Sequence, residues 1–369
     1  MEQLRFKPPC VSERDMPAPA LRQMFEEMEF ILSEDVCALE KRLAGFVGAP
    51  FCVAASDAAS AVALALASAG IGGSGDSVLC TALGCGIPVQ GILMAGAAPV
   101  FVDVSPNSYT IDPYCLEYAL NKLNRAGETM PKALIATDLF GAPCQYEALE
   151  HICGQRGIVL IEDMSGAFGA KFAGKTAGSF GRFAVASFSA SGPLEELGGA
   201  AVFCHDEDDA RRLASLRQAN KQQFFGEVGA VLPCVSSADA LVMDARLEYY
   251  IQQLERRRYA AKAYRESLQG VVHMQQPVCG SESAYSQFVV ALPRNIKRSR
   301  VAGQMRAMNI PCGPPLCGMQ TAYSDWNRVM LTNTLALSER LLSLPIHPYL
   351  SGHLVEYICR CLVRCIDTP

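Results

Sequence analysis

Apolar residues recur at helical spacing near the start of the chain and then collect in short runs between polar turns. Residues 21–46 carry apolar positions three and four apart, which predicts a helical lead-in. From residue 51 to residue 203, short β-like runs alternate with helix-like segments, the rhythm of βαβ units. This alternation predicts a mostly parallel, doubly wound sheet. The expected strands are 51–54, 77–80, 99–104, 133–136, 158–162, 183–187 and 199–203, and the expected helices are 58–69, 88–95, 115–123 and 145–155.

The alternation stops at a long polar-rich segment, 239–268, where we expect a connecting helix. Beyond it the pattern predicts a smaller α/β unit that ends in helices. We therefore expect an N-terminal lead-in with a large domain over residues 1–245 and a small C-terminal domain over residues 246–369. The elements expected after the long helix are a strand at 287–292, a helix at 300–308, a loop rich in Pro, Gly and Cys at 311–318, and helices at 331–341 and 352–365.

Composition and charge exclude several classes of protein. The chain has 369 residues, of which 50% are hydrophobic and 19% charged, which is enough apolar material for a large domain with a smaller companion. The formal net charge is −5, and no run of Lys or Arg alternates with aromatic residues, so we expect no nucleic acid partner. No apolar run reaches the roughly 20 residues that a membrane helix needs. Residues 1–14 lack the apolar segment of a secretory signal, and a cytoplasmic protein is expected.

Sixteen cysteines are scattered through long hydrophobic segments. In a chain of this size they are expected to be reduced, buried thiols rather than a disulfide scaffold. The groups that come closest to a metal site lack the spacing of a zinc site and have no nearby histidine, so we expect no metal. These groups are Cys80 with Cys85, Cys312 with Cys317, and Cys359 with Cys361 and Cys365.

The loops that follow the parallel strands are where a ligand is expected, because ligands of open α/β sheets bind outside the carboxyl ends of the strands. The segment 159–163, Val-Leu-Ile-Glu-Asp, is an apolar strand that ends in two carboxylates and continues into the small residues of 164–169. An acid at this position can meet the protonated nitrogen of a ligand. The alternative interpretation is a helix cap or a solvent-facing acid at a strand end.

Several segments occur in an order and spacing typical of one enzyme family. They are 52–56 (Cys-Val-Ala-Ala-Ser), 96–104 (Gly-Ala-Ala-Pro-Val-Phe-Val-Asp-Val), 161–163 (Ile-Glu-Asp), 174–181 (Gly-Lys-Thr-Ala-Gly-Ser-Phe-Gly) and 342–348 (Leu-Ser-Leu-Pro-Ile-His-Pro). From residue 21 to residue 366 the chain resembles the DegT/StrS sugar-nucleotide aminotransferases, which are pyridoxal-phosphate enzymes of fold type I. The resemblance implies a seven-stranded large domain, a small C-terminal α/β domain, a homodimer with active sites at the subunit interface, and a sugar nucleotide as the candidate ligand.

The family's catalytic lysine has no counterpart at the expected place. Transamination with pyridoxal phosphate requires a lysine that forms a Schiff base with the cofactor and moves a proton between substrate and cofactor. In this family the lysine lies in a segment like S-F-x-x-x-K that precedes a Gly-Gly strand. Here the segment is 187–199, Ser-Phe-Ser-Ala-Ser-Gly-Pro-Leu-Glu-Glu-Leu-Gly-Gly. The lysine position falls on Gly192 when aligned from Ser187, or on Ser191 when aligned from the glycine pair, and neither residue supplies an amine.

The other cofactor contacts implied by the resemblance are mostly changed as well. The Ser-Gly-Thr turn that holds the cofactor phosphate reads Asp57-Ala58-Ala59, which puts a carboxylate where a hydroxyl is expected. The residue that stacks on the pyridine ring falls at Cys85, and the glutamine after the Ile-Glu-Asp segment falls at Gly166. An Asn-Tyr-Arg motif that reaches the partner's site falls on 232–234, Leu-Pro-Cys.

Asp163 is retained, and Ser187 is a candidate phosphate contact. We therefore expect no bound cofactor, with pyridoxal phosphate as the alternative, and we expect Asp57 to cap a helix.

Three functional hypotheses follow. The favoured one is an aminotransferase homologue that is inactive or repurposed, with a retained sugar-nucleotide pocket or an active relative as partner. The second is a working pyridoxal-phosphate aminotransferase of nucleotide-sugar and polysaccharide biosynthesis that uses a displaced lysine such as Lys221, or an external amine. The third is an enzyme without pyridoxal phosphate in the remodelled cleft. Its candidate residues are Asp57, Cys85, Asp163, Glu195 and Glu196.

Overall fold

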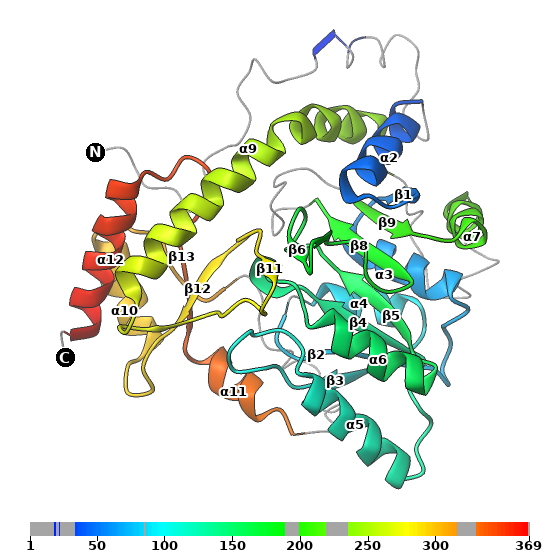
Figure 1. Cartoon of the computed structure of the whole chain (residues 1–369), viewed down its shortest axis with the longest axis horizontal. Coiled ribbons are helices and arrows are strands. Elements are labelled where there is room, and N and C mark those ends of the chain that lie inside the picture. Colours follow the sequence, from blue (N-terminus) through cyan, green and yellow to red (C-terminus); the bar gives the residue numbers. More distant parts are fainter. Residues whose placement is uncertain are drawn as a thin grey trace.

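A large sheet forms the centre of the fold, and its strands are β1 (Phe51–Ala55), β2 (Ser77–Thr81), β3 (Ala98–Val102), β4 (Ala133–Thr137), β5 (Val159–Asp163), β8 (Phe183–Ser187) and β9 (Ala200–Cys204). The computed structural model describes residues 18–19, 22, 34–84, 86–188, 199–218, 235–315 and 330–367. The sheet has seven strands in the order β1-β9-β8-β5-β4-β2-β3 (Figure 1). Only the pairs made by β9, with β1 and with β8, are antiparallel. The prediction of a mostly parallel, seven-stranded sheet is confirmed.

Helices cover both faces of this sheet, and they are α2 (Glu34–Val47), α3 (Ala58–Ser68), α4 (Ile87–Met94), α5 (Pro113–Arg125), α6 (Tyr146–Arg156) and α7 (Glu207–Gln218). Successive side chains of a strand point to opposite faces, so each strand serves two cores. In β8, Phe183 and Val185 pack in a core with α3, α4 and α7, whereas Ala184 and Ala186 pack in a core with α2. On this second face, α5 and α6 cover the other end of the sheet.

The long helix α9 (Ser237–Leu268) links the large sheet to a second core (Figure 1). It begins at the cap residue Ser236, whose hydroxyl accepts a hydrogen bond from the Asp239 amide at 3.1 Å. Met243 and other residues of its first half pack with α2, and Tyr264 and other residues of its second half pack in the second core. The expected division between residues 245 and 246 falls inside this helix and stays a prediction.

The second core lies around a three-stranded antiparallel sheet in the order β10-β12-β13. Two further helices close it, and α9 packs against the last of them. A separate small sheet has the order β11-β6-β7. The bounds are β6 (Lys171–Phe172), β7 (Lys175–Thr176), β10 (His273–Met274), β11 (Ser281–Glu282), β12 (Phe288–Ala291), β13 (Leu341–Leu344), α10 (Arg298–Ala307), α11 (Thr332–Ser338) and α12 (Gly352–Asp367), with a short 3-10 turn η2 (Leu139–Gly141).

The helix expected at 331–341 is wrong at its end. Helix α11 ends at Ser338, and strand β13 begins at Leu341 after a two-residue turn. β13 pairs antiparallel with β12, with Leu344 opposite Phe288, and this pairing buries three leucines in the interior. Burial against a neighbouring strand outweighs the helical preference of a leucine-rich segment. The sequence pattern also did not predict α7. Of the expected helical lead-in, residues 23–33 and residue 21 lie outside the described residues, whereas α2 confirms its second half.

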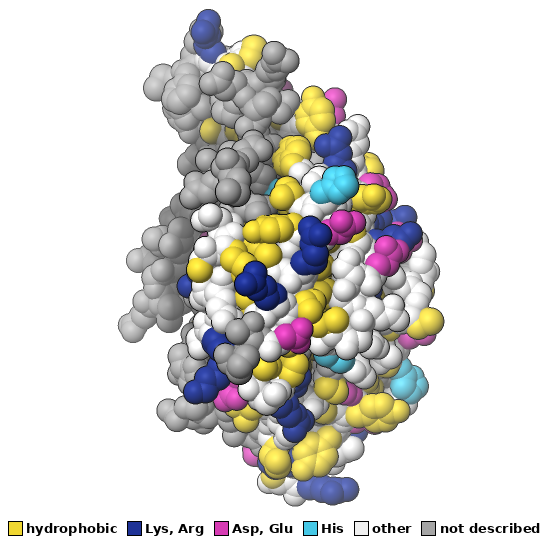
Figure 2. Space-filling model, turned by 90° about the vertical axis from the view of Figure 1, so that its left-hand side faces the viewer, with side chains coloured by type: hydrophobic (Ala, Val, Ile, Leu, Met, Phe, Trp, Pro, Cys, Tyr) yellow, Lys and Arg dark blue, Asp and Glu magenta, His cyan; other side chains and the backbone are white. Residues whose placement is uncertain are grey.

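The face that carries α12 mixes charges of both signs with hydrophobic side chains (Figure 2). Within the described ranges no helix combines the length and the apolar character needed to cross a membrane.

Candidate functional site

The carboxyl ends of four parallel strands meet at one edge of the large sheet. The register places Ala55 of β1 and Ser187 of β8 on either side of Ala200, the first residue of β9. It also places Asp163 of β5 beside Thr137 of β4. The loops after these strands therefore start at neighbouring points, where an open α/β sheet binds its ligand.

Asp163 is a buried carboxylate at this edge, with 2% of its surface exposed. One carboxylate oxygen accepts a hydrogen bond from the Thr137 hydroxyl at 3.1 Å, and the other accepts one from the Ser165 amide at 3.2 Å. Burial raises the pKa of Asp163, and the hydrogen bonds from Ser165 and Thr137 only partly oppose that shift. A ligand with a protonated nitrogen would stabilise the ionised form of this carboxylate.

The turn after β5 is tied to the end of β8. The Met164 amide donates to the Val185 carbonyl at 2.9 Å, and the Ser187 amide donates to the Ser165 hydroxyl at 3.1 Å. Ser187 is 1% exposed, so its position is fixed within the fold. The sequence pattern did not single out Thr137 or Ser165. The signal that could have found them is their position at the end of a predicted parallel strand and in the turn after Asp163.

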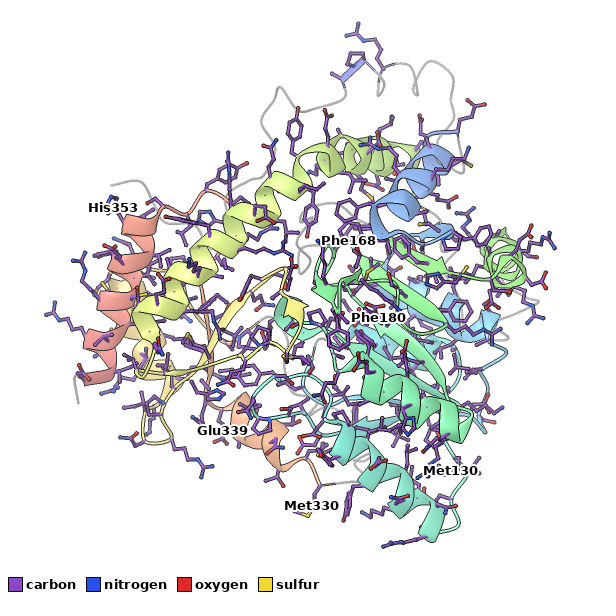
Figure 3. All side chains as sticks on the ribbon, viewed as in Figure 1. Met130, Phe168, Phe180, Met330, Glu339 and His353 are labelled. Carbon is purple, nitrogen blue, oxygen red and sulfur yellow. The ribbon has the colours of Figure 1, made fainter. Side chains whose placement is uncertain are left out.

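The other carboxylate of the segment, Glu162, faces a different part of the molecule. It accepts hydrogen bonds from the amides of Gly178 at 2.7 Å and Phe180 at 3.0 Å, which hold the loop between β7 and β8. Phe180, labelled in Figure 3, stacks on Tyr146 with ring centroids 4.4 Å apart. The adjacent carboxylates at 162 and 163 therefore have separate roles, because neighbouring side chains of a strand point to opposite faces.

Asp57 caps helix α3 at the same edge of the sheet, as its position in the sequence predicts. Its backbone is extended, and one carboxylate oxygen accepts the Ser60 amide at 2.9 Å. The other oxygen accepts the Ser60 hydroxyl at 2.6 Å and the Ser56 hydroxyl at 2.8 Å. Burial opposes ionisation, but the hydrogen bonds from Ser60, Ser56 and the Ala59 amide outweigh it and lower the pKa of Asp57. The carboxylate at the start of α3 is therefore ionised at neutral pH.

Ala58 and Ala59 form the first turn of α3 and are buried. They contribute no side-chain hydroxyl beside the Asp57 carboxylate.

Gly166 lies where two loops come close together. A Cβ atom at this position would meet the Asp138 carbonyl oxygen and the Ser286 hydroxyl at 3.2 Å. The two loops are also joined by a backbone hydrogen bond, because the Gly141 carbonyl oxygen accepts the Ala284 amide at 2.9 Å. A longer side chain at 166 would have to displace this packing.

The connection between β8 and β9 is anchored at both ends. The Phe188 amide donates to the Gly199 carbonyl at 3.0 Å, directly beyond the pairing of Ser187 with Ala200. Residues 189–198 between these anchors lie outside the described part of the chain, and their sequence, Ser-Ala-Ser-Gly-Pro-Leu-Glu-Glu-Leu-Gly, contains neither lysine nor histidine. The predicted site positions Ser191, Gly192, Glu195 and Glu196 belong to this segment. Those elsewhere that also lie outside the described residues are Cys85, Lys221 and 232–234.

The aromatic residues behind the site join it to α9. Phe168, in the loop after β5, lies between the sheet and α9 and stacks on Phe46 with ring centroids 4.7 Å apart (Figure 3). Its carbonyl oxygen accepts the hydroxyl of Tyr250. Within the described ranges, no cluster of His, Cys, Asp or Glu side chains is arranged to hold a metal ion. The site thus presents carboxylate and hydroxyl groups at the ends of the parallel strands.

Comparisons with known proteins agree over nearly the whole chain. UDP-2-acetamido-2-deoxy-3-oxo-D-glucuronate aminotransferase of Pseudomonas aeruginosa is 27% identical over 95% of this chain and 96% of its own length. dTDP-3-amino-3,6-dideoxy-alpha-D-galactopyranose transaminase of Aneurinibacillus thermoaerophilus is 26% identical over 94% of each chain. The crystal structure of a DegT DnrJ EryC1 StrS aminotransferase from Brucella abortus is 29% identical, with a TM-score of 0.86 over 95% of both chains.

The family model for the DegT/DnrJ/EryC1/StrS aminotransferases matches residues 12–363. This match includes the whole large sheet, the site at its edge and the sheet of the second core. The chain belongs to the DegT/DnrJ/EryC1/StrS aminotransferase family.

Proposed function

We propose that this protein is a member of the aminotransferase family that does not transaminate and that acts by binding a sugar nucleotide without pyridoxal phosphate. The observation that carries the proposal is the anchored connection between β8 and β9. Its ends are fixed by the Phe188–Gly199 hydrogen bond and by the pairing of Ser187 with Ala200. Whichever residue of 189–198 is aligned with the family lysine, the segment supplies no amine. Neither Gly192 nor Ser191 can form an imine or move a proton at neutral pH.

The residues around the anchored connection also fit pyridoxal phosphate poorly. Asp163 could hold a protonated ring nitrogen, since it is buried and accepts hydrogen bonds. At the start of α3, however, the carboxylate of Asp57 already takes the Ser60 amide and hydroxyl that face an anion in such a turn. A phosphate group placed there would meet a like charge. Asp163 and Ser187 are kept while the other expected contacts are changed, which supports a site that works without this cofactor.

The proposed ligand class comes from the family. Relatives that match this chain over nearly its whole length are named for UDP-linked and dTDP-linked sugars. We propose that the protein forms a homodimer and that the sugar nucleotide binds beside the strand ends. A thermal-shift titration with UDP-sugars and dTDP-sugars, with UMP and dTMP as controls, tests this part. Saturable stabilisation by a sugar nucleotide supports this ligand class. Equal stabilisation by the sugar nucleotides and by UMP and dTMP contradicts it.

The second candidate is a working aminotransferase that uses a displaced lysine such as Lys221, and the retained Asp163 favours it. Incubation of the purified protein with pyridoxal phosphate, followed by borohydride reduction and peptide mapping, separates the two. We expect no saturable adduct on any single lysine, only the slow labelling that exposed lysines give. The Pseudomonas aeruginosa relative is the positive control for the assay. A saturable visible band that maps to one lysine peptide of this chain would overturn the proposal.

A further inference from the structure

Asp57 makes the contacts with the start of α3 that a bound anion would make. The first-turn amide of Ser60 donates to one carboxylate oxygen at 2.9 Å, and the hydroxyls of Ser60 and Ser56 donate to the other at 2.6 and 2.8 Å. A helix N-terminus carries a partial positive charge and unpaired amides, so a negative group here is stabilising. In this chain a side chain supplies that group.

The Asp57 carboxylate lies at the edge of the sheet where a ligand is expected, so it can affect ligand binding as well as helix α3. β1 ends at Ala55, which pairs with Ala200, and Ala200 also pairs with Ser187 at the end of β8. Asp57 therefore stands at the ligand-binding edge of the sheet, near the anchored connection between β8 and β9. By contrast, Asp112 caps α5 with a similar contact, 2.8 Å to the Tyr114 amide, but it lies after β3 at the outer end of the strand order.

We propose that the Asp57 carboxylate takes the place of the phosphate group that the family resemblance puts at this turn, so that the start of α3 does not bind pyridoxal phosphate or another phosphate monoester. This inference rests on the proposed function, because it takes the cleft to work without pyridoxal phosphate, but the observation behind it is the cap of α3 rather than the missing lysine. Ala58 and Ala59 fit the same picture, since neither offers a hydroxyl to an incoming phosphate. A phosphate monoester carries a charge of about −1.5 to −2 at neutral pH and would be repelled by the carboxylate at this turn.

The test compares the wild-type protein with D57S and with D112S as the matched control. Ser is a good helix cap and carries no charge, so D57S should fold, with a fall in Tm on the order of 2 °C at most. Inorganic phosphate and pyridoxal phosphate are then titrated at constant ionic strength, with chloride as the balancing salt. The midpoint of unfolding and the apparent affinity are measured for each protein.

We expect saturable stabilisation of D57S by both phosphate compounds, with an apparent affinity about tenfold or more above that of the wild type. D112S should lose a similar amount of stability and show no saturable response. D57N keeps the shape of the cap without its charge and provides the same test if D57S folds poorly.

Equal responses of wild type and D57S would overturn the inference, since Asp57 would then not close the turn. A response of D112S equal to that of D57S would do so as well. These readouts do not depend on the lysine, so they stay separate from the borohydride experiment. An adduct on one lysine would contradict the proposed function. The stabilisation of D57S by phosphate compounds would still decide the role of Asp57.

Discussion

The Tyr109 hydroxyl lies 2.9 Å from Nδ1 of His273, and this contact joins the loop between β3 and α5 to the first strand of the smaller sheet. Tyr109 is fully buried and has a φ angle of 61°, a left-handed conformation that is uncommon outside glycine. Gln275 adds to this junction, because its side-chain amide donates to the carbonyl of Ser108 at 2.7 Å and to that of Leu139 at 2.9 Å. The two cores are held together by hydrogen bonds as well as by apolar packing.

Replacing Tyr109 with phenylalanine should weaken this junction without creating a cavity. The variant loses the hydrogen bond to His273 but keeps the ring, so the free energy of unfolding should fall by about 1 kcal/mol. Urea denaturation followed by circular dichroism measures the change. Tyr114→Phe is the control, because Tyr114 is 84% exposed. Equal stability of the two variants would show that the contact with His273 contributes nothing.

Gly141 should tolerate no side chain. Its φ angle is 98°, and a Cβ atom there would lie 2.5 Å from the backbone nitrogen of Tyr285. Gly141→Ala therefore has to move one of two backbone segments, and we expect a loss of about 3 kcal/mol or more. Gly154→Ala, within α6, meets nothing within 4 Å and should be neutral or stabilising by up to about 1 kcal/mol. Comparable thermal midpoints for the two variants would contradict the close approach of these loops.

His347 should make the protein less stable as the pH falls. Burial, together with the charge of Arg257, lowers the pKa of His347 to about 4. Its Nδ1 accepts the Tyr349 amide at 3.3 Å, so the neutral ring is the form that the fold holds. The unfolded chain takes up a proton near pH 6.5 and the folded chain does not, so stability is lost between about pH 6.5 and 4, by up to about 3 kcal/mol.

His347→Asn keeps an acceptor but cannot titrate, and it should flatten this part of the stability profile. Urea midpoints measured at intervals across the range give the slope for each protein. If the variant and the wild type lose stability in parallel, His347 is not the group responsible.

Asp138 should act in the opposite direction. Burial raises the pKa of Asp138 to about 7, and the hydrogen bonds from Tyr146 and Cys144 only partly oppose the shift. The folded chain holds a proton that the unfolded chain releases near pH 4. Stability should therefore decrease as the pH rises from about 4 to about 7, by an amount on the order of 4 kcal/mol. Among the described residues, Oδ2 of Asp138 is a buried atom without a hydrogen-bond partner, which fits a protonated carboxyl group.

Asp138→Asn tests this expectation. The variant keeps an Oδ1 atom for the Cys144 amide and the Tyr146 hydroxyl, both at 2.8 Å, and removes the titration. We expect the wild type to gain stability relative to the variant at pH 5 and to lose that gain at pH 8. Asp112→Asn, at the cap of α5, is the control for a change of charge alone. A pH-independent difference between Asp138→Asn and the wild type would contradict the assignment.

The periodicity of apolar residues was sufficient for the strands of the large sheet and for its covering helices other than α7. It was not sufficient for β13. Leu341, Leu342 and Leu344 continue a leucine-rich helical pattern, and only the presence of β12 beside them selects the extended form. The spacing of apolar residues within one segment does not show which distant strand that segment pairs with.

For the candidate site, position at the end of a predicted strand identified Asp163, and the family resemblance singled out Asp57 at the start of α3. Sequence position could not identify Thr137 as a partner of Asp163, because that requires the register between β4 and β5. The contact of Ser165 is local, but its direction depends on the turn that follows β5. Nor could sequence position separate Glu162 from Asp163 in role. Alternation along a strand implies that the two side chains point to opposite faces of the sheet. It does not show that Glu162 accepts hydrogen bonds from the loop that contains Gly178 and Phe180.

The uninterrupted helix α9 contributes Met243 and Leu247 to the interior beside α2, and Tyr264 and Leu268 to the interior beside β12. Unfolding of either core would remove the apolar contacts of one half of α9 and expose its apolar side chains to water. Heat or denaturant should therefore unfold both parts in one cooperative transition, and a fragment that ends in the middle of the helix should be unable to hold either part in its native shape.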